Sequence, residues 1–197
     1  MRKLTLADVK DLFEYEKTRA EFRQRIIELK KRRRVSVGDK VSLVFENTET
    51  ALSQVQEMVR AERIVDPAKI QFEIDTYNAL IPDEGDLSAT LFIEITTAGD
   101  LRTELDRLIG MDAAGVVSIE LDGAERVEGH FETGHSNEQR ISAVHYVTFR
   151  FTPAQRRAFL EASSARRPIS LVIDHPNYRH RAELGADVAA SLAEDLS

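Results

Sequence analysis

The order of helix-like and strand-like segments along the chain limits its possible folds more than any other feature of the sequence. Helical spacing and capping signals predict helices within residues 1–34, 51–59, 66–80, 97–110, 153–164 and 181–196. Alternating or β-branched stretches predict strands at residues 41–45, 90–96, 116–121, 126–132, 141–151 and 169–174. Because helices and strands are mixed without strict alternation, we expect an α+β fold with a mixed β-sheet of five to seven strands packed with helices. The expected organisation is a single domain over residues 1–197, with a helical pair in residues 1–34 and a mixed body in residues 35–197.

The clearest helix start is Thr152-Pro153-Ala154-Gln155, which combines a capping threonine, a proline at the first helical position and a capping-box glutamine. We expect this helix to reach about Ser164, and if it makes an ordinary crossover it joins two parallel strands. That topology would leave His145 and His175 ~20 Å apart along the strand direction. The two histidines would meet only in an antiparallel or strongly staggered arrangement.

Composition excludes several classes of function. The 197 residues include no cysteine, so the chain has no disulfide, no thiolate-held zinc or iron–sulfur cluster and no cysteine nucleophile. No apolar run approaches the ~18 residues of a membrane span, and the first residues do not read as a signal peptide. We therefore expect a soluble cytoplasmic protein that has no membrane partner and holds no cofactor.

The net charge of −7 conceals an asymmetry between the two ends of the chain. Residues 1–40 hold 13 Lys or Arg and 7 Asp or Glu, whereas the remaining 157 residues hold 14 and 27. The basic end culminates in the run at residues 30–34, which could hold a small anion or an acidic protein face, or could simply close a helix. The acidic bulk and the lack of interleaved aromatics argue against nucleic acid as a partner.

The histidines suggest two possible sites. His145 and His175 fall on the apolar faces of their strands, where each is either a hydrogen-bonded core residue or part of a shared functional site. His130, Glu132 and His135 could bind a metal ion, but a polar loop explains them equally well. We expect no metal site.

A polar seam runs beside the apolar stripe of the helix around residues 51–59. A three-residue spacing places Gln54, Glu57 and Arg60 along it, either as solvated pairs or as an anion clamp. We expect Glu57 and Arg60 to form a buried or half-buried cluster with Arg33 or Arg34.

The chain resembles an uncharacterised bacterial family, the domain of unknown function numbered 3501. The matching stretches follow one another in order along nearly the whole chain: residues 29–35, Phe45-Glu46-Asn47 with Thr50, residues 55–64, 77–83 and 89–94, Ser142-Ala143-Val144-His145, and Asp174-His175-Pro176-Asn177-Tyr178. The resemblance weakens at residues 125–140, where this chain carries two histidines. It implies an accessory role beside redox proteins, namely rubrerythrin-like diiron proteins and a cysteine-rich iron–sulfur protein.

Three hypotheses about function follow. The first is an accessory or binding protein that acts with such redox partners or with a small anionic ligand. The second is a metal-dependent or small-anion-converting enzyme that uses His145 and His175, and the third is a nucleic-acid binder that uses residues 30–34. The candidate ligand- or partner-binding residues are Arg33, Arg34, Glu46, Asn47, Gln54, Glu57, Arg60, Glu62, Tyr77, Asn78, His145, Asp174, His175 and Tyr178.

Overall fold

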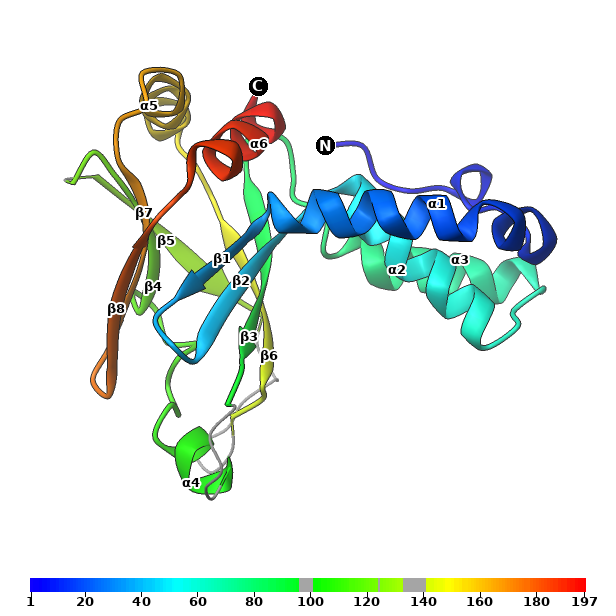
Figure 1. The fold of residues 1–197 in the computed structure, drawn as a ribbon, viewed down its shortest axis with the longest axis horizontal. Helices are drawn as coiled ribbons and strands as arrows, with labels where there is room; N and C mark the ends of the chain where they lie inside the picture. Colours follow the sequence, from blue (N-terminus) through cyan, green and yellow to red (C-terminus); the bar gives the residue numbers. More distant parts are fainter. Residues whose placement is uncertain (96–100, 124, 133–140) are drawn as a thin grey trace.

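The computed structural model describes residues 1–95, 101–123, 125–132 and 141–197 (Figure 1). In chain order the helices are the 3-10 turn η1 (Leu6–Asp8), α1 (Leu12–Lys31), α2 (Thr48–Ala61), α3 (Pro67–Asn78), α4 (Leu101–Asp106), α5 (Pro153–Ser164) and α6 (Ala186–Leu196). The strands are β1 (Arg34–Val37), β2 (Val41–Glu46), β3 (Leu87–Ile93), β4 (Val117–Leu121), β5 (Glu125–Phe131), β6 (Val144–Phe149), β7 (Ile169–His175) and β8 (Tyr178–Glu183).

The strands of the described residues form one eight-stranded sheet in the order β1-β2-β3-β6-β5-β4-β7-β8. Every pair of neighbouring strands is antiparallel. The α+β class is therefore confirmed, but the expected mixed sheet of five to seven strands is wrong. The extra strands are β1, which is short and starts inside the basic run, and β8, whose charged residues resemble a helix face.

The sheet curves until its two edge strands approach each other, and Tyr178 at the start of β8 fastens them together (Figure 1). Its hydroxyl donates to the Val37 carbonyl at 2.7 Å and accepts from the Lys40 backbone N–H at 2.9 Å. Gly38 makes this approach possible. It has a φ of +74°, and an added Cβ would lie 2.3 Å from the Tyr178 hydroxyl.

Two separate apolar cores follow from this arrangement. The larger fills the inside of the curved sheet and is closed by α5 and α6, which contribute Phe159 and Leu192. The smaller joins η1, α1, α2 and α3 into a helical arm that projects from the sheet (Figure 1). Val55, Val59 and Ile74 lie at its centre. The arm is thus built from α2 and α3 as well as from the N-terminal segment.

Some of the elements predicted from the sequence are confirmed by the structure, and others differ from it. The Thr152 cap is confirmed, since its Oγ accepts from the Gln155 N–H at 3.2 Å while the Gln155 side chain accepts from the Thr152 N–H at 2.9 Å.

Residues 1–34 hold one long helix and a single turn instead of a helical pair. The C-terminal helix begins at Ala186, not at Arg181. Of the two topologies considered for α5, the parallel crossover does not occur, because β6 and β7 are not neighbours and run in opposite directions. Part of the expected helix at residues 97–110 lies outside the described residues.

In the described part of the chain, no helix has both the length and the apolar character that crossing a membrane requires.

Candidate functional site

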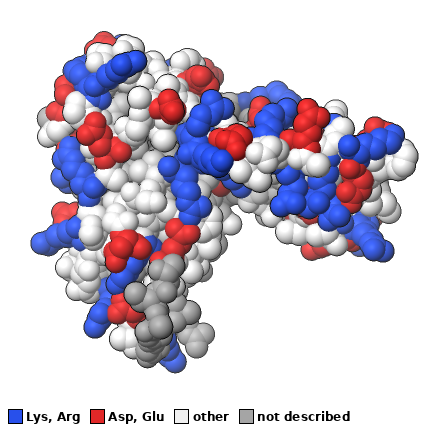
Figure 2. Space-filling view, viewed as in Figure 1, with Lys and Arg blue, Asp and Glu red and all other residues white. Residues whose placement is uncertain are grey.

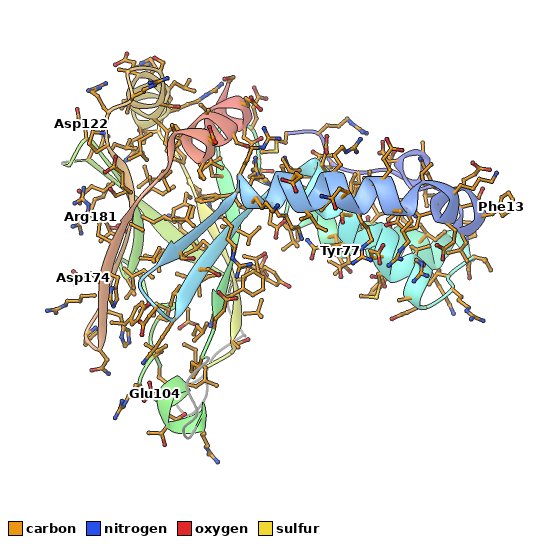
Figure 3. All side chains as sticks on the ribbon, in the orientation of Figure 1. Phe13, Tyr77, Glu104, Asp122, Asp174 and Arg181 are labelled. Carbon is orange, nitrogen blue, oxygen red and sulfur yellow. The ribbon has the colours of Figure 1, made fainter. Side chains whose placement is uncertain are left out.

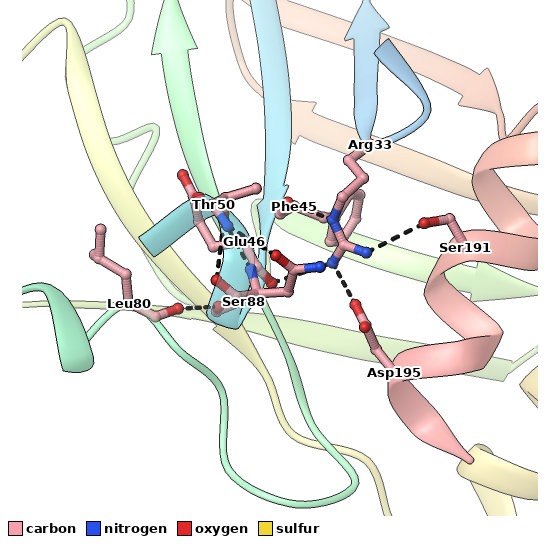
Figure 4. A network of polar contacts seen from close by, with 9 residues as sticks. Arg33, Phe45, Glu46, Thr50, Leu80, Ser88, Ser191 and Asp195 are labelled. Atoms are coloured by element: carbon pink, nitrogen blue, oxygen red, sulfur yellow. Dashed lines mark hydrogen bonds and ion pairs between the residues drawn. The ribbon is translucent and has the colours of Figure 1, made fainter. Parts of the chain in front are cut away.

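A buried arginine lies where the arm meets the sheet. Arg33 follows α1 and is only 1% exposed. Its Nε donates to the Phe45 carbonyl at 2.8 Å and its Nη2 to the Glu46 carbonyl at 3.1 Å. The guanidinium also binds Ser191 and Asp195 of α6 (Figure 4). One side chain therefore joins the end of α1, the end of β2 and the C-terminal helix.

The Glu46 side chain is also buried, but its partners are hydroxyl groups. Its Oε2 accepts from Thr50 Oγ1 at 2.5 Å and its Oε1 from Thr90 Oγ1 at 2.7 Å. Asn47 then caps α2, with its side chain accepting from the Thr50 N–H at 2.9 Å. Nearby, Ser88 donates to the Leu80 carbonyl at the point where the chain returns from the arm to the sheet (Figure 4). The connections between arm and sheet thus meet in one polar junction, which consists of Arg33, Glu46, Thr50, Ser88, Thr90, Ser191 and Asp195.

The junction behaves as a rigid joint instead of an open ligand site. Burial raises the pKa of the Asp195 carboxyl, and the Arg33 guanidinium opposes that increase. Six of the seven junction residues, Arg33 among them, are buried, and the side chain of the seventh, Asp195, is only 12% exposed. Buried polar groups that satisfy one another fix a single arrangement. The junction therefore sets the direction in which the arm projects.

Glu57 lies in a different cluster from the one predicted. Its carboxylate receives two hydrogen bonds from Arg19 of α1, both 2.8 Å long, and one of 2.6 Å from the Tyr15 hydroxyl. The Arg19 bonds, with help from Tyr15, lower the Glu57 pKa to about 2. Burial, and then the Glu57 bond, raise the Tyr15 pKa. The half-buried cluster exists, but its cation is Arg19 and not Arg33 or Arg34.

Arg60 is likewise separated from the basic run. Its Nε contacts Glu16 of α1 at 2.7 Å, so the predicted cluster of Glu57 and Arg60 with Arg33 or Arg34 is wrong. Arg34 instead pairs with Glu94 at 2.6 Å on the sheet. The basic run at residues 30–34 is therefore divided between a buried joint and the surface, and does not form one continuous cationic face.

The two buried histidines approach the same segment of chain. His145 is the second residue of β6 and His175 the last of β7, and the antiparallel topology puts both at one end of the sheet. His175 Nε2 lies 2.9 Å from the Ile109 carbonyl, and His145 Nδ1 lies 4.0 Å from an Asp112 carboxylate oxygen. The separation expected from a parallel crossover therefore does not apply.

Both imidazole rings bind main chain, as core histidines do. Asn177 donates its backbone N–H to His175 Nδ1 at 3.2 Å, so the Nε2 of that ring carries the proton and donates to the Ile109 carbonyl. His145 Nε2 lies 2.8 Å from the Ser142 carbonyl. Through its bond to the Ile109 carbonyl, His175 tethers the segment that follows α4 to the sheet.

The other predicted residues are dispersed. Asn78 holds the N-terminal segment, with its amide accepting from the Leu4 N–H at 2.7 Å and donating to the Leu4 carbonyl at 3.0 Å. Burial raises the pKa of Tyr77, which faces the corner between arm and sheet (Figure 3). Gln54 has a buried amide nitrogen with no hydrogen-bond partner, and Glu62 is exposed at the end of α2.

Two predicted residues lie at the far edge of the sheet. Asp174 is exposed and pairs with Arg179 at 3.0 Å, while Tyr178 has the closing role described above. The sequence motif around His175 therefore reflects the turn between β7 and β8 and its contacts.

The alternative that His130, Glu132 and His135 bind a metal ion finds little support in the described residues. His130 is exposed on β5, and His135 lies outside the described residues. Within residues 1–95, 101–123, 125–132 and 141–197, no group of three or more His, Cys, Asp or Glu side chains is placed to hold a metal ion.

Comparison with known proteins identifies the family of this chain. The family model described as "Protein of unknown function (DUF3501)" matches residues 3–196. The chain belongs to this family. A crystal structure of a novel protein of unknown function from Burkholderia pseudomallei K96243 is 35% identical, covers 100% of both chains and superposes with a TM-score of 0.88. No match was found among curated proteins.

The DUF3501 resemblance is therefore confirmed, and several of the matched stretches map onto structural joints. Phe45-Glu46-Asn47 lies in the polar junction, and His175 lies in the tethered turn. Sequence reasoning missed Arg19 and Asp195, the two main charge partners. Both are charged residues on helices that carry several other charges, so no local signal marks them.

Proposed function

We propose that this protein is a non-enzymatic binding protein whose projecting helical arm recognises a partner. One observation carries the proposal. Among the described residues, the exposed large apolar side chains all lie on the arm: Leu6, Phe13, Ile27, Val65 and Phe72. Phe13 lies at the far end of the arm (Figure 3) and is 70% exposed.

Exposed apolar residues gathered on a projecting element are typical of a protein-interaction surface. The polar junction supports the same interpretation, since a rigid joint presents the arm in one orientation and lowers the entropic cost of binding. A core-type role for His145 and His175 weakens the enzyme hypothesis, because both rings contact main-chain carbonyls. The redox proteins implied by the family resemblance are the partners that we propose to test first.

The test is calorimetric titration of the full chain with a purified rubrerythrin-like protein and a purified cysteine-rich iron–sulfur protein from the same organism. We expect saturable binding that Phe13→Ser weakens about tenfold, a loss of ~1.4 kcal/mol. Thr148→Ser, a substitution on the sheet, should leave the affinity unchanged. Binding that survives Phe13→Ser but is lost in a sheet variant would contradict the role of the arm.

A second measurement addresses the enzyme hypothesis. Elemental analysis of the untagged protein should find less than one transition metal per chain. About one metal per chain, lost in both His145→Ala and His175→Ala, would favour the enzyme instead.

A further inference from the structure

The outer face of α1 carries an exposed apolar line, at whose far end the Lys17 ammonium lies over the Phe13 ring, 4.0 Å from its centroid. Phe13, Ala20 and Ile27 are seven residues apart, a spacing that returns to nearly the same side of a helix every two turns. All three are exposed, Phe13 at 70% and Ile27 at 46%. The line runs for about 21 Å along the helix, at 1.5 Å per residue.

Arginines border this line. A groove of about 400 Å³ runs beside it and is lined by Glu16, Arg19, Ala20, Arg23, Gln24 and Ile27. A second opening of about 340 Å³ shares Glu16 with the first and adds Arg60 and Arg63 from the end of α2. Figure 2 shows Lys and Arg side chains on this face of the arm, with Asp and Glu side chains among them.

The charge of the groove is only partly balanced within the chain. Glu57 pairs with Arg19, and Glu16 with Arg60. Arg23 and Arg63 have no side-chain hydrogen bond or ion pair to any residue that the structure describes. Their N–H groups can therefore donate to carboxylates from outside, although the charge of Arg23 also helps to lower the Glu57 pKa.

We propose that this groove binds an acidic amphipathic helix of a partner protein. The heptad line matches the apolar seam of a second helix, and the flanking arginines match carboxylates beside that seam. The inference rests on the proposed function and specifies the chemistry of the partner. A second copy of α1 is a poor occupant, because it would bring the same excess of arginine against Arg23 and Arg63.

The probe is a fluorescein-labelled peptide of 21 residues with Leu at heptad positions a and d and Glu at e and g. A matched peptide carries Lys in place of Glu. Fluorescence anisotropy with the full chain measures both affinities at ~150 mM salt, where screening of exposed charges is physiological. We expect the Glu peptide to bind at least about tenfold more tightly than the Lys peptide.

Three variants locate the binding. Arg23→Glu and Ile27→Ser, both at exposed positions, should each weaken the Glu peptide about tenfold. Lys69→Glu makes the same charge change at an exposed position of α3 and should change the affinity less than about twofold. Circular dichroism confirms that each variant is folded.

The outcomes separate this inference from the proposed function. Equal binding of the two peptides, no binding of the Glu peptide at ~1 mM, or an unaffected Ile27→Ser variant would overturn the acidic helix. A 20-nucleotide oligomer that binds through Arg23 but not Ile27 would also overturn it. Each of these results leaves the arm-dependent titration with redox proteins to decide the proposed function by itself.

Discussion

Replacement of Arg33 by methionine tests the polar junction most severely. The guanidinium donates to the Phe45 and Glu46 carbonyls and pairs with Asp195, and its side chain is only 1% exposed. Removing one partner of a buried pair typically costs ~3–5 kcal/mol, since the other charge is left without compensation. Methionine retains most of the apolar volume, so the loss reflects the polar contacts.

The assay is urea unfolding followed by circular dichroism, because the chain has no tryptophan. Arg34→Met is the matched control. Arg34 is the next residue along the chain and also has a carboxylate partner, but its side chain is 43% exposed, and it should lose at most ~1 kcal/mol. If Arg33→Met loses less than ~1 kcal/mol, the junction is not a structural joint.

If Arg33→Met does not fold, Asp195→Asn gives the same information more gently. Asparagine keeps an acceptor for Arg33 while removing the charge, so we expect a smaller loss of ~1–3 kcal/mol. An unchanged free energy of unfolding in Asp195→Asn would contradict the pairing of Arg33 with Asp195.

Further predictions concern pH, the closure of the sheet and the tethered turn. The Glu57 pKa is lowered to about 2, so the stability that Glu57 contributes is complete above pH ~4.5 and is lost as the pH falls toward 2. Partial exposure limits this contribution to ~1–2 kcal/mol. The free energy of unfolding of Glu57→Gln should therefore differ less between pH 7 and pH 3 than that of the wild type. Gly38→Ala should lower the melting temperature well beyond Gly115→Ala, because both have positive φ but only Gly38 would clash with Tyr178. His175→Ala should lose ~1–3 kcal/mol in urea unfolding, because the Ile109 carbonyl loses its donor; an unchanged midpoint would refute this.

Local signals in the sequence were sufficient for α2, α5 and most of the central strands. The α5 helix follows from the Thr152 cap, and the buried face of α2 follows from the spacing of Val55 and Val59. Such signals act over a few residues and survive in the folded chain. The β8 strand was misread because only Tyr178 is buried in it, so a charged edge strand carries no alternating pattern.

The candidate site was harder to predict because its partners are distant in sequence. Glu57 was correctly expected to need a cation, but its partner Arg19 lies 38 residues away. Arg33 pairs with Asp195 across 162 residues. Periodicity within one helix cannot choose among several arginines on another, and only the packing of α1 on α2 makes that choice.

Site-specific photocrosslinking tests most directly whether the arm is the recognition element. A photoreactive phenylalanine analogue is placed at position 13 of the full chain, or at the exposed position 128 on β5, in the cells of the source organism. The account predicts a discrete adduct with another protein from position 13, lost when Arg23→Glu is added, and none from position 128. Adducts from position 128 alone, or no adduct from position 13, would contradict recognition by the arm, whereas an adduct at position 13 that Arg23→Glu leaves unchanged would contradict only the acidic-helix inference.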